Sequence, residues 1–341
     1  MNRDTGRRAF VWGAAVAMIL AGLYTRWPGF YMDTKYRDIY FVWNEGEQIA
    51  RGVNPYERVR GSDMVNNDKY PTYLPPMYLF GAAARLAGFR TFESFLMFWR
   101  FLILMADIAV GLIILRYALK KGRGDIGLFT LFFWLFCRWS LYVWEIGNTE
   151  AILALLMIGA VMTWDRRPVI GALLFGMALG IKHFGILLLP VLLARSRDPK
   201  EMMKRLGWVL AIPVLTSLPF FITSPVGFTK AMLFSVVRGA GTHLLEDARS
   251  IRILFGASGW ISRLFLFGVF CLYWTAAIRG RWNLWLAAAT AFTVFISFNP
   301  VLFTQYFGWI TPFGLLYLCD VSASPPEQAP PKAVRSAGDI G

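Results

Sequence analysis

The sequence predicts an all-α polytopic membrane protein, a helical bundle of about ten transmembrane helices. Of its 341 residues, 57% are hydrophobic and only 16% are charged, whereas a soluble domain carries about a quarter charged residues. The apolar residues come in helix-length blocks, and helices satisfy their own backbone polar groups in lipid. The net charge of +14 lies in short basic clusters between these blocks. That pattern is typical of cytoplasmic loops, so we expect no nucleic-acid partner.

Each predicted span is an apolar block bounded by polar or basic residues. The segment 168–194 is long, and basic loops precede and follow it, so we expect two short helices that meet near Lys182 on the far side. The basic clusters predict that both termini lie in the cytoplasm. The sequence has no N-x-[ST] acceptor site and the chain is short, which favours a prokaryotic plasma (inner) membrane over the endoplasmic reticulum. The predicted spans are 9–24, 95–119, 126–144, 149–164, 168–194 as two helices, 206–222, 253–278, 284–298 and 306–319.

The predicted organisation is a single membrane domain, 1–319, followed by a tail, 320–341, rich in Pro, Ala and Ser. Such a composition predicts cytoplasmic disorder. The first outer loop covers 25–94. Within it, residues 73–88 begin YLPP and are predicted to lie on the outer face, because a crossing there would place every later basic loop outside. Residues 223–250 form a second, amphipathic outer segment.

Two aspartates, Asp33 and Asp38, follow the first span in the stretch YMDTKYRDIYF. Residues 36–51 carry apolar and polar side chains on opposite faces, which predicts a helix lying in the membrane interface. Asp38 falls in its first turn, where the helix dipole favours a carboxylate. From spacing alone, Asp38 either caps this helix or does chemistry.

The run DIYFVWNEGEQIARGVNPYE, followed by YPTYLPPMYLF, resembles the first outer loop of GT-C membrane glycosyltransferases. It is similar to glycosyltransferase family 87 and to the catalytic mannosyltransferase of GPI-anchor assembly. EIGNTE at 145–150, GALLFGMALGIKHFGILLLP at 171–190 and TQYFGWITP at 304–312 resemble later motifs of these families. The GPI enzyme has a D-x-D pair where this chain has Tyr36 and Asp38, so Asp38 is the expected catalytic residue, with Asp33 as a possible second acid.

The resemblance implies transfer of a sugar from a polyprenyl-phosphate donor to a hydroxyl of a glycolipid, glycan or protein acceptor. The sugar is mannose-like or a pentose, and the reaction takes place on the extracytoplasmic face. No cofactor is expected, and a divalent metal is allowed but not favoured. Asp38 is the general base. The remaining predicted substrate contacts are Arg100, Arg138 and Lys182 for phosphate, and Glu150, Gln305 and Tyr306 for the sugar or the acceptor.

Each of these residues also has a plain structural interpretation. Arg100 can snorkel to the interface, and Glu150 can belong to a helix hairpin around the Gly147 turn. Asp107 is expected to bond to Arg100 or to a neighbouring helix. A transporter or flippase, and a ligase or polymerase of lipid-linked glycans, are the rival functions. A transporter would place its polar groups near the bilayer midplane, whereas the carboxylates here cluster at one outer face.

Overall fold

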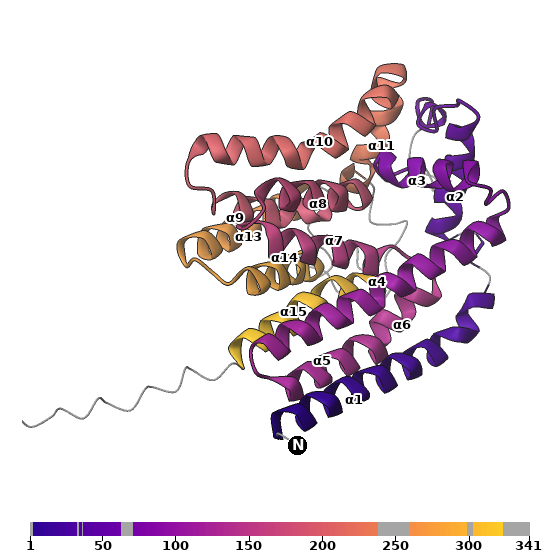
Figure 1. The fold of residues 1–341 in the computed structure, drawn as a ribbon. Coiled ribbons are helices and arrows are strands. Elements are labelled where there is room, and N and C mark those ends of the chain that lie inside the picture. Colours follow the sequence, from indigo (N-terminus) through magenta and orange to yellow (C-terminus); the bar gives the residue numbers. More distant parts are fainter. Residues whose placement is uncertain are drawn as a thin grey trace, which may run out of the picture.

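The computed structural model describes residues 3–32, 34–35, 37–62, 71–237, 260–298 and 303–322. Within these ranges the chain forms α-helices and short 3-10 helices and no β-strand. Figure 1 shows the longer helices side by side in one bundle, with α2 (Asp38–Ala50), α3 (Pro75–Leu86) and α11 (Pro225–Val237) gathered at one end. The predicted all-α membrane fold is confirmed.

Four segments of the described chain are long and apolar enough to cross a membrane. Shorter apolar helices pack against them and against one another. The four long segments are α1 (Arg3–Arg26) with η1 (Trp27–Tyr31), α4 (Phe92–Lys120), α5 (Gly124–Phe136) with α6 (Arg138–Glu145), and α10 (Pro199–Thr223). The shorter helices are α7 (Glu150–Thr163), α8 (Pro168–Ile181), η3 (His183–Leu188), α9 (Leu189–Leu193), α13 (Trp260–Arg279), α14 (Leu284–Phe298), η5 (Thr304–Tyr306) and α15 (Phe307–Val321).

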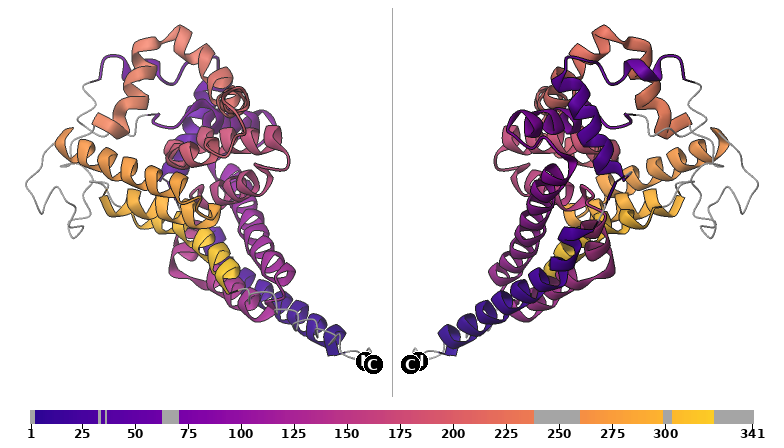
Figure 2. Two further views of the ribbon diagram at one scale, coloured as in Figure 1. Left: turned by 90° about the vertical axis from the view of Figure 1, so that its left-hand side faces the viewer. Right: turned by 90° about the vertical axis from the view of Figure 1, so that its right-hand side faces the viewer.

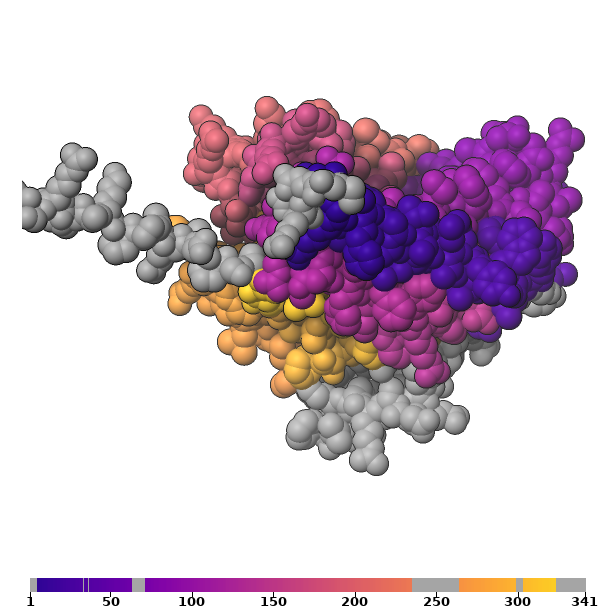
Figure 3. All heavy atoms as spheres, turned by 60° about the horizontal axis from the view of Figure 1, so that its bottom comes forward, coloured from indigo at the N-terminus to yellow at the C-terminus, as the bar shows by residue number. Residues whose placement is uncertain are grey.

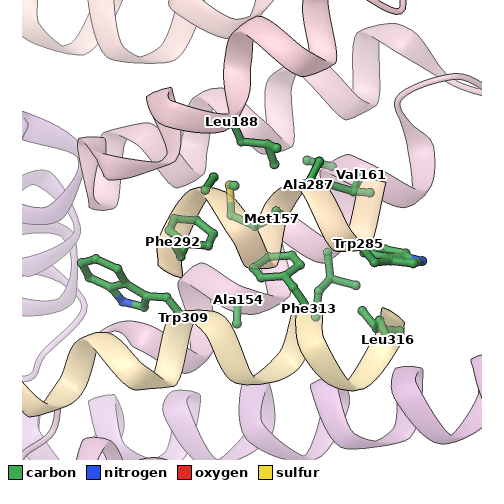
Figure 4. Close-up of a cluster of buried hydrophobic side chains, with 14 of the residues drawn as sticks. Ala154, Met157, Val161, Leu188, Trp285, Ala287, Phe292, Trp309, Phe313 and Leu316 are labelled. Atoms are coloured by element: carbon green, nitrogen blue, oxygen red, sulfur yellow. The ribbon is translucent and has the colours of Figure 1, made fainter. Parts of the chain in front are cut away.

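The core lies where α7, α14 and α15 meet. Figure 4 shows Trp309 and Phe313 of α15 facing Phe292 of α14 and Met157 of α7. Each of these four side chains is at most 2% exposed. Aromatic rings bury the largest areas and prefer offset or edge contacts, such as the 5.6 Å separation between the rings of Phe292 and Phe313. This core holds the start of α15, with Trp309, in a fixed place.

The segment 168–194 contains the predicted break. Helix α8 ends at Ile181, Lys182 is extended, and η3 and α9 follow. Pro168 at the start of α8 and Ala194 just after α9 line the same cavity, so the chain reverses at Lys182. The prediction of two short helices meeting there is confirmed.

A second break was not predicted. The span predicted at 126–144 is interrupted, because Cys137 is extended (ψ 144°) and separates α5 from α6. A break in a membrane helix frees backbone carbonyls that need donors. The Leu135 carbonyl accepts a 2.9 Å hydrogen bond from Arg26 at the end of α1, which compensates the break.

The helix predicted at 36–51 is confirmed as α2, with Asp38 as its first residue, and its place in the membrane interface stays a prediction. Its apolar face packs on α3, which begins at the predicted Pro75–Pro76 pair. The two helices approach closely at Gly46, where a Cβ would lie 2.6 Å from the Ala82 backbone nitrogen. Helix α11 also joins this region, because Lys230 donates to the Ser62 carbonyl at 3.0 Å.

Helix α1 lies on the surface of the bundle, as Figure 3 shows, and it packs chiefly on α5. Its outward side chains are apolar; Phe10, for example, is 70% exposed. Figure 2 shows the start of α1 at the opposite end of the molecule from α2 and α3. An exposed apolar helix of this length is typical of a span that faces lipid.

Two predicted boundaries fall partly outside the described residues. The span predicted at 253–278 is described from Trp260 onward, and the tail is described only to residue 322. The tail was predicted to begin at 320, but α15 continues to Val321, because Asp320 accepts from Tyr117 at 2.7 Å and pairs with Lys121.

Candidate active site

Asp38 lies at the first turn of α2 and is half-buried. The Tyr73 hydroxyl donates to Asp38 Oδ2 at 3.1 Å. Tyr73 immediately precedes the α3 prolines, so the packing of α3 on α2 brings it to the carboxylate. The neighbouring Ile39 is buried, and its Cγ2 lies 3.4 Å from the place of a Cβ on Gly147. The start of α2 is therefore seated on the turn that leads into α7.

That turn contains the motif EIGNTE. Gly147 has a φ of +69°, a left-handed conformation that favours glycine. The Gly147 carbonyl accepts from Trp99 Nε1 at 2.8 Å, which fixes the turn to α4. Glu150 follows as the first residue of α7 and is 1% exposed. The local sequence thus delivers a buried carboxylate beside the start of α2.

Glu150 is ion-paired with Lys182, the residue at the break after α8. Lys182 is 5% exposed, and its Nζ lies 5.3 Å from the centroid of the Trp309 ring. The end of α8 reaches this place because it packs on the start of α3: a Cβ on Gly180 would lie 2.7 Å from Pro76 Cγ. Charges buried in a membrane protein are costly and are usually paired or functional.

The charges of this cluster act on one another. The negative charges of the Asp38 and Glu150 carboxylates repel each other. Burial raises the pKa of Tyr73 well above its ordinary value of 10, and both carboxylates raise it further. Tyr73 therefore stays protonated and acts as a hydrogen-bond donor. We use the name acid–lysine cluster for Asp38, Tyr73, Glu150, Lys182 and Trp309.

Two buried polar atoms of the acid–lysine cluster are unsatisfied. Glu150 Oε2 and Trp309 Nε1 have no hydrogen-bond partner among the residues that the structure describes. An unsatisfied buried polar atom costs about 1–3 kcal/mol. One acceptor and one donor, both beside Lys182, are what a hydroxylated, anionic substrate would engage.

Arg100 does not point its donors into this cluster. It is fully buried, and it donates to the carbonyls of Phe30 at 2.9 Å and Met32 at 2.8 Å, and to Glu145 at 3.3 Å. Arg100 thereby fastens the segment between α1 and α2 to the end of α6. A phosphate contact by Arg100 stays a prediction, and the geometry favours a positioning role.

Asp107 is bonded to a neighbouring helix and not to Arg100. Arg26 Nη2 lies 2.8 Å from Asp107 Oδ2 and also donates to Ser140 at 2.8 Å. Arg26 was not singled out from the sequence, because it lies just after the predicted first span. The cost of a lone Asp107 in mid-span was the signal that such a partner must exist.

Of the other predicted contacts, Tyr306 touches the acid–lysine cluster through Trp309. Arg138 is exposed at the start of α6, with its guanidinium 5.9 Å from the Trp139 ring centroid. Gln305 is half-buried in η5, and Tyr306 is 4% exposed and stacks on Trp309 at 4.4 Å. Tyr306 thus supports Trp309. Asp33 lies outside the described residues.

Tyr73 and Trp309 were not predicted, although both lie inside quoted motifs, YPTYLPPMYLF and TQYFGWITP. An aromatic residue among many in an apolar chain carries little signal by itself. In the described part of the chain, no group of three or more His, Cys, Asp or Glu side chains is arranged to hold a metal ion.

The arrangement of these residues can support acid–base and phosphate chemistry. A half-buried carboxylate can accept a proton, and a buried ammonium group can hold a phosphate oxygen. The model of glycosyltransferase family 87 matches residues 71–278. The matched range covers more than half of the 341 residues and includes Tyr73, Glu150 and Lys182, whereas Asp38 and Trp309 lie outside it. The chain belongs to glycosyltransferase family 87.

Proposed function

We propose that this protein transfers a sugar from a polyprenyl-phosphate donor to a hydroxyl acceptor on the extracytoplasmic face of the membrane. The observation that carries the proposal is the acid–lysine cluster, in which a candidate base and a buried cation lie at one end of the bundle. A lipid-linked donor reaches such a site from within the bilayer. A glycolipid, a glycan or a protein can supply the acceptor hydroxyl.

In the proposed step, the acceptor oxygen attacks the anomeric carbon of the donor sugar. The new carbon–oxygen bond forms while the bond between that carbon and the phosphate oxygen breaks, and the electron pair leaves with polyprenyl phosphate. Asp38 takes the acceptor proton as general base. The Tyr73 hydroxyl orients the Asp38 carboxylate through their hydrogen bond. An attack opposite the phosphate inverts the anomeric centre.

Lys182 is the proposed phosphate contact. An ammonium group has three N–H donors, and Glu150 takes one of them. The others face the negative charge that grows on the phosphate as the bond to the sugar breaks, which lowers the barrier. The free Glu150 Oε2 accepts from a sugar or acceptor hydroxyl, and Trp309 Nε1 donates to another oxygen.

The supporting residues place this chemistry, and they also bear on the sugar. Arg100 is a positioning residue for the outer loop, and Tyr306 supports Trp309 by stacking. The resemblance of EIGNTE and TQYFGWITP to motifs of the GPI mannosyltransferase supports a mannose-like sugar, and family 87 membership equally supports a pentose.

The test is the Asp38→Asn variant, assayed for transfer from mannosyl- and arabinosyl-phosphoryl polyprenol to a glycolipid acceptor. Loss of a general base lowers the rate by about 10²–10⁴-fold. Glu93→Gln is the matched control, because Glu93 is an exposed carboxylate in the first turn of α4, outside the acid–lysine cluster, and its replacement should leave transfer unchanged. Parent-level transfer by folded Asp38→Asn protein would reject the assignment. Passage of donor across proteoliposomes without covalent product would favour the transporter.

A further inference from the structure

A second polar site lies at the opposite end of α7 and α8 from Glu150 and Lys182. A cavity of about 760 Å³ opens between the α7–α8 turn, the α9–α10 loop and the α13–α14 turn. Because α7 has 14 residues, the two sites are separated by roughly 20 Å along its axis. The cavity is lined by Asp165, Arg166, Pro168, Val191, Ala194, Arg195, Arg197, Glu201, Arg205, Ala277, Ile278, Arg281 and Trp282.

Five arginines and two carboxylates line this arginine cavity, which leaves a net charge of +3 (five minus two). Both carboxylates are paired with arginines of the same cavity. Asp165 Oδ2 accepts from Arg195 Nε at 3.1 Å and Nη2 at 2.9 Å. Glu201 pairs with Arg205, which is 5% exposed and also donates to the Trp164 carbonyl at 3.1 Å.

Three guanidinium groups remain available. Those of Arg166, Arg197 and Arg281 make no hydrogen bond or salt bridge with the residues that the structure describes. They come from three separate segments, so the fold and not a local run of sequence brings them together. Arg281 also has a φ of +45°, a conformation that costs a non-glycine residue energy and that is enriched at functional sites.

The chemistry of the lining selects the ligand. Every cation in it is arginine and none is lysine, and the planar guanidinium binds phosphate oxygens in pairs. The lining also contains apolar side chains, among them the buried Val191 and Ala277 and the half-buried Trp282. A basic pocket with apolar walls at the ends of membrane helices suits the phosphate of an anionic phospholipid and the beginning of its acyl chains.

We propose that the arginine cavity binds the headgroup phosphate of an anionic phospholipid, held by Arg166, Arg197 and Arg281. The loops that form it are the basic loops at 165–167, 195–205 and 279–281. Their charge is what the cytoplasmic leaflet, rich in anionic lipid, attracts. The bound lipid bridges three turns of the bundle and steadies the end of α8 opposite Lys182.

The experiment compares the full chain in detergent with the triple variant Arg166→Gln/Arg197→Gln/Arg281→Gln. Native mass spectrometry measures the affinity for phosphatidylglycerol against phosphatidylcholine. Removing three cations from the cavity weakens phosphatidylglycerol binding by roughly tenfold or more. The control triple variant Arg7→Gln/Arg8→Gln/Lys120→Gln removes three exposed charges outside the cavity and should change the affinity less than threefold.

Unfolding temperature provides the second readout, which keeps the test valid for a variant of altered stability. Phosphatidylglycerol should raise the unfolding temperature of the parent and of the control variant, but not that of the cavity variant. Equal losses in both triple variants would mean a general surface-charge effect and would overturn the proposal. Equal stabilisation by inorganic phosphate without lipid would reassign the cavity to a soluble phosphate ligand.

Discussion

Replacing Lys182 with methionine removes one half of a buried ion pair. Lys182 and Glu150 are 5% and 1% exposed, and each is the other's charged partner in the described chain. With Lys182 gone, the Glu150 charge stays buried without compensation. Loss of one partner of a buried pair costs about 3–5 kcal/mol of folding free energy. We expect Lys182→Met to be strongly destabilised.

The double variant Lys182→Met/Glu150→Gln separates stability from chemistry. Neither side chain then carries a charge, so no buried charge is left without its partner, and the double variant should be more stable than Lys182→Met. Transfer should not recover, because the phosphate has lost its cation. Loss of one preorganised donor to a developing charge lowers kcat by about 10²–10³-fold.

The assay combines two measurements on the same purified protein. Thermal unfolding in detergent reports stability, and sugar transfer from a polyprenyl-phosphate donor reports catalysis. Lys120→Met is the matched control, since Lys120 is an exposed lysine at the end of α4. It should affect neither measurement.

Two outcomes would refute the reasoning. Parent-level transfer by the double variant would show that Lys182 does not contact the phosphate. Undiminished stability of Lys182→Met would show that the pair is not buried as an ion pair.

Three further changes follow from the geometry. Tyr73→Phe removes the hydroxyl that donates to the proposed base, so kcat should fall by roughly tenfold or more, while the lost hydrogen bond should cost only about 0.5–1.5 kcal/mol of stability in thermal unfolding. Gly46→Ala forces a Cβ to 2.6 Å from α3 backbone and should lower stability by about 1–3 kcal/mol, whereas Gly13→Ala, with no atom within 4 Å, should have little effect on unfolding. Arg26→Met leaves Asp107 buried alone and should cost about 3–5 kcal/mol, measured by thermal unfolding.

The sequence predicted the features that depend on local pattern. The two-faced pattern at 36–51 predicted α2 with Asp38 in its first turn, and the paired prolines predicted the start of α3. The break at Lys182 followed from charge, because a lysine in mid-span is costly and the flanking basic loops must lie on one side. These signals come from neighbouring residues and need no knowledge of tertiary contacts.

The features that the sequence did not predict depend on contacts between distant segments. The Cys137 break lies in an unbroken apolar run, and its compensating donor, Arg26, is 109 residues from Leu135 in the chain. The same holds for the partners of buried charges. Burial cost predicted that Asp107 must be paired, but the pairing with Arg26 spans 81 residues, which periodicity does not reveal.

The two buried pairs differ in how completely their hydrogen bonds are used, and this difference assigns their roles. The Arg26–Asp107 pair is closed, because Arg26 also donates to Ser140 and to the Leu135 carbonyl. A closed network contributes to folding and offers nothing to a ligand.

The Lys182–Glu150 pair is open, because Glu150 Oε2 has no partner in the described residues and Lys182 keeps two donors. Leaving such groups unsatisfied costs stability, and a protein keeps that cost where a substrate satisfies them.

Saturating donor lipid should therefore raise the unfolding temperature of the parent, but not that of Lys182→Met/Glu150→Gln. In Arg26→Met protein that still folds, the same rise should persist, because its acid–lysine cluster is intact. A rise of equal size in the Lys182→Met/Glu150→Gln protein would contradict the assignment of roles by open and closed pairs.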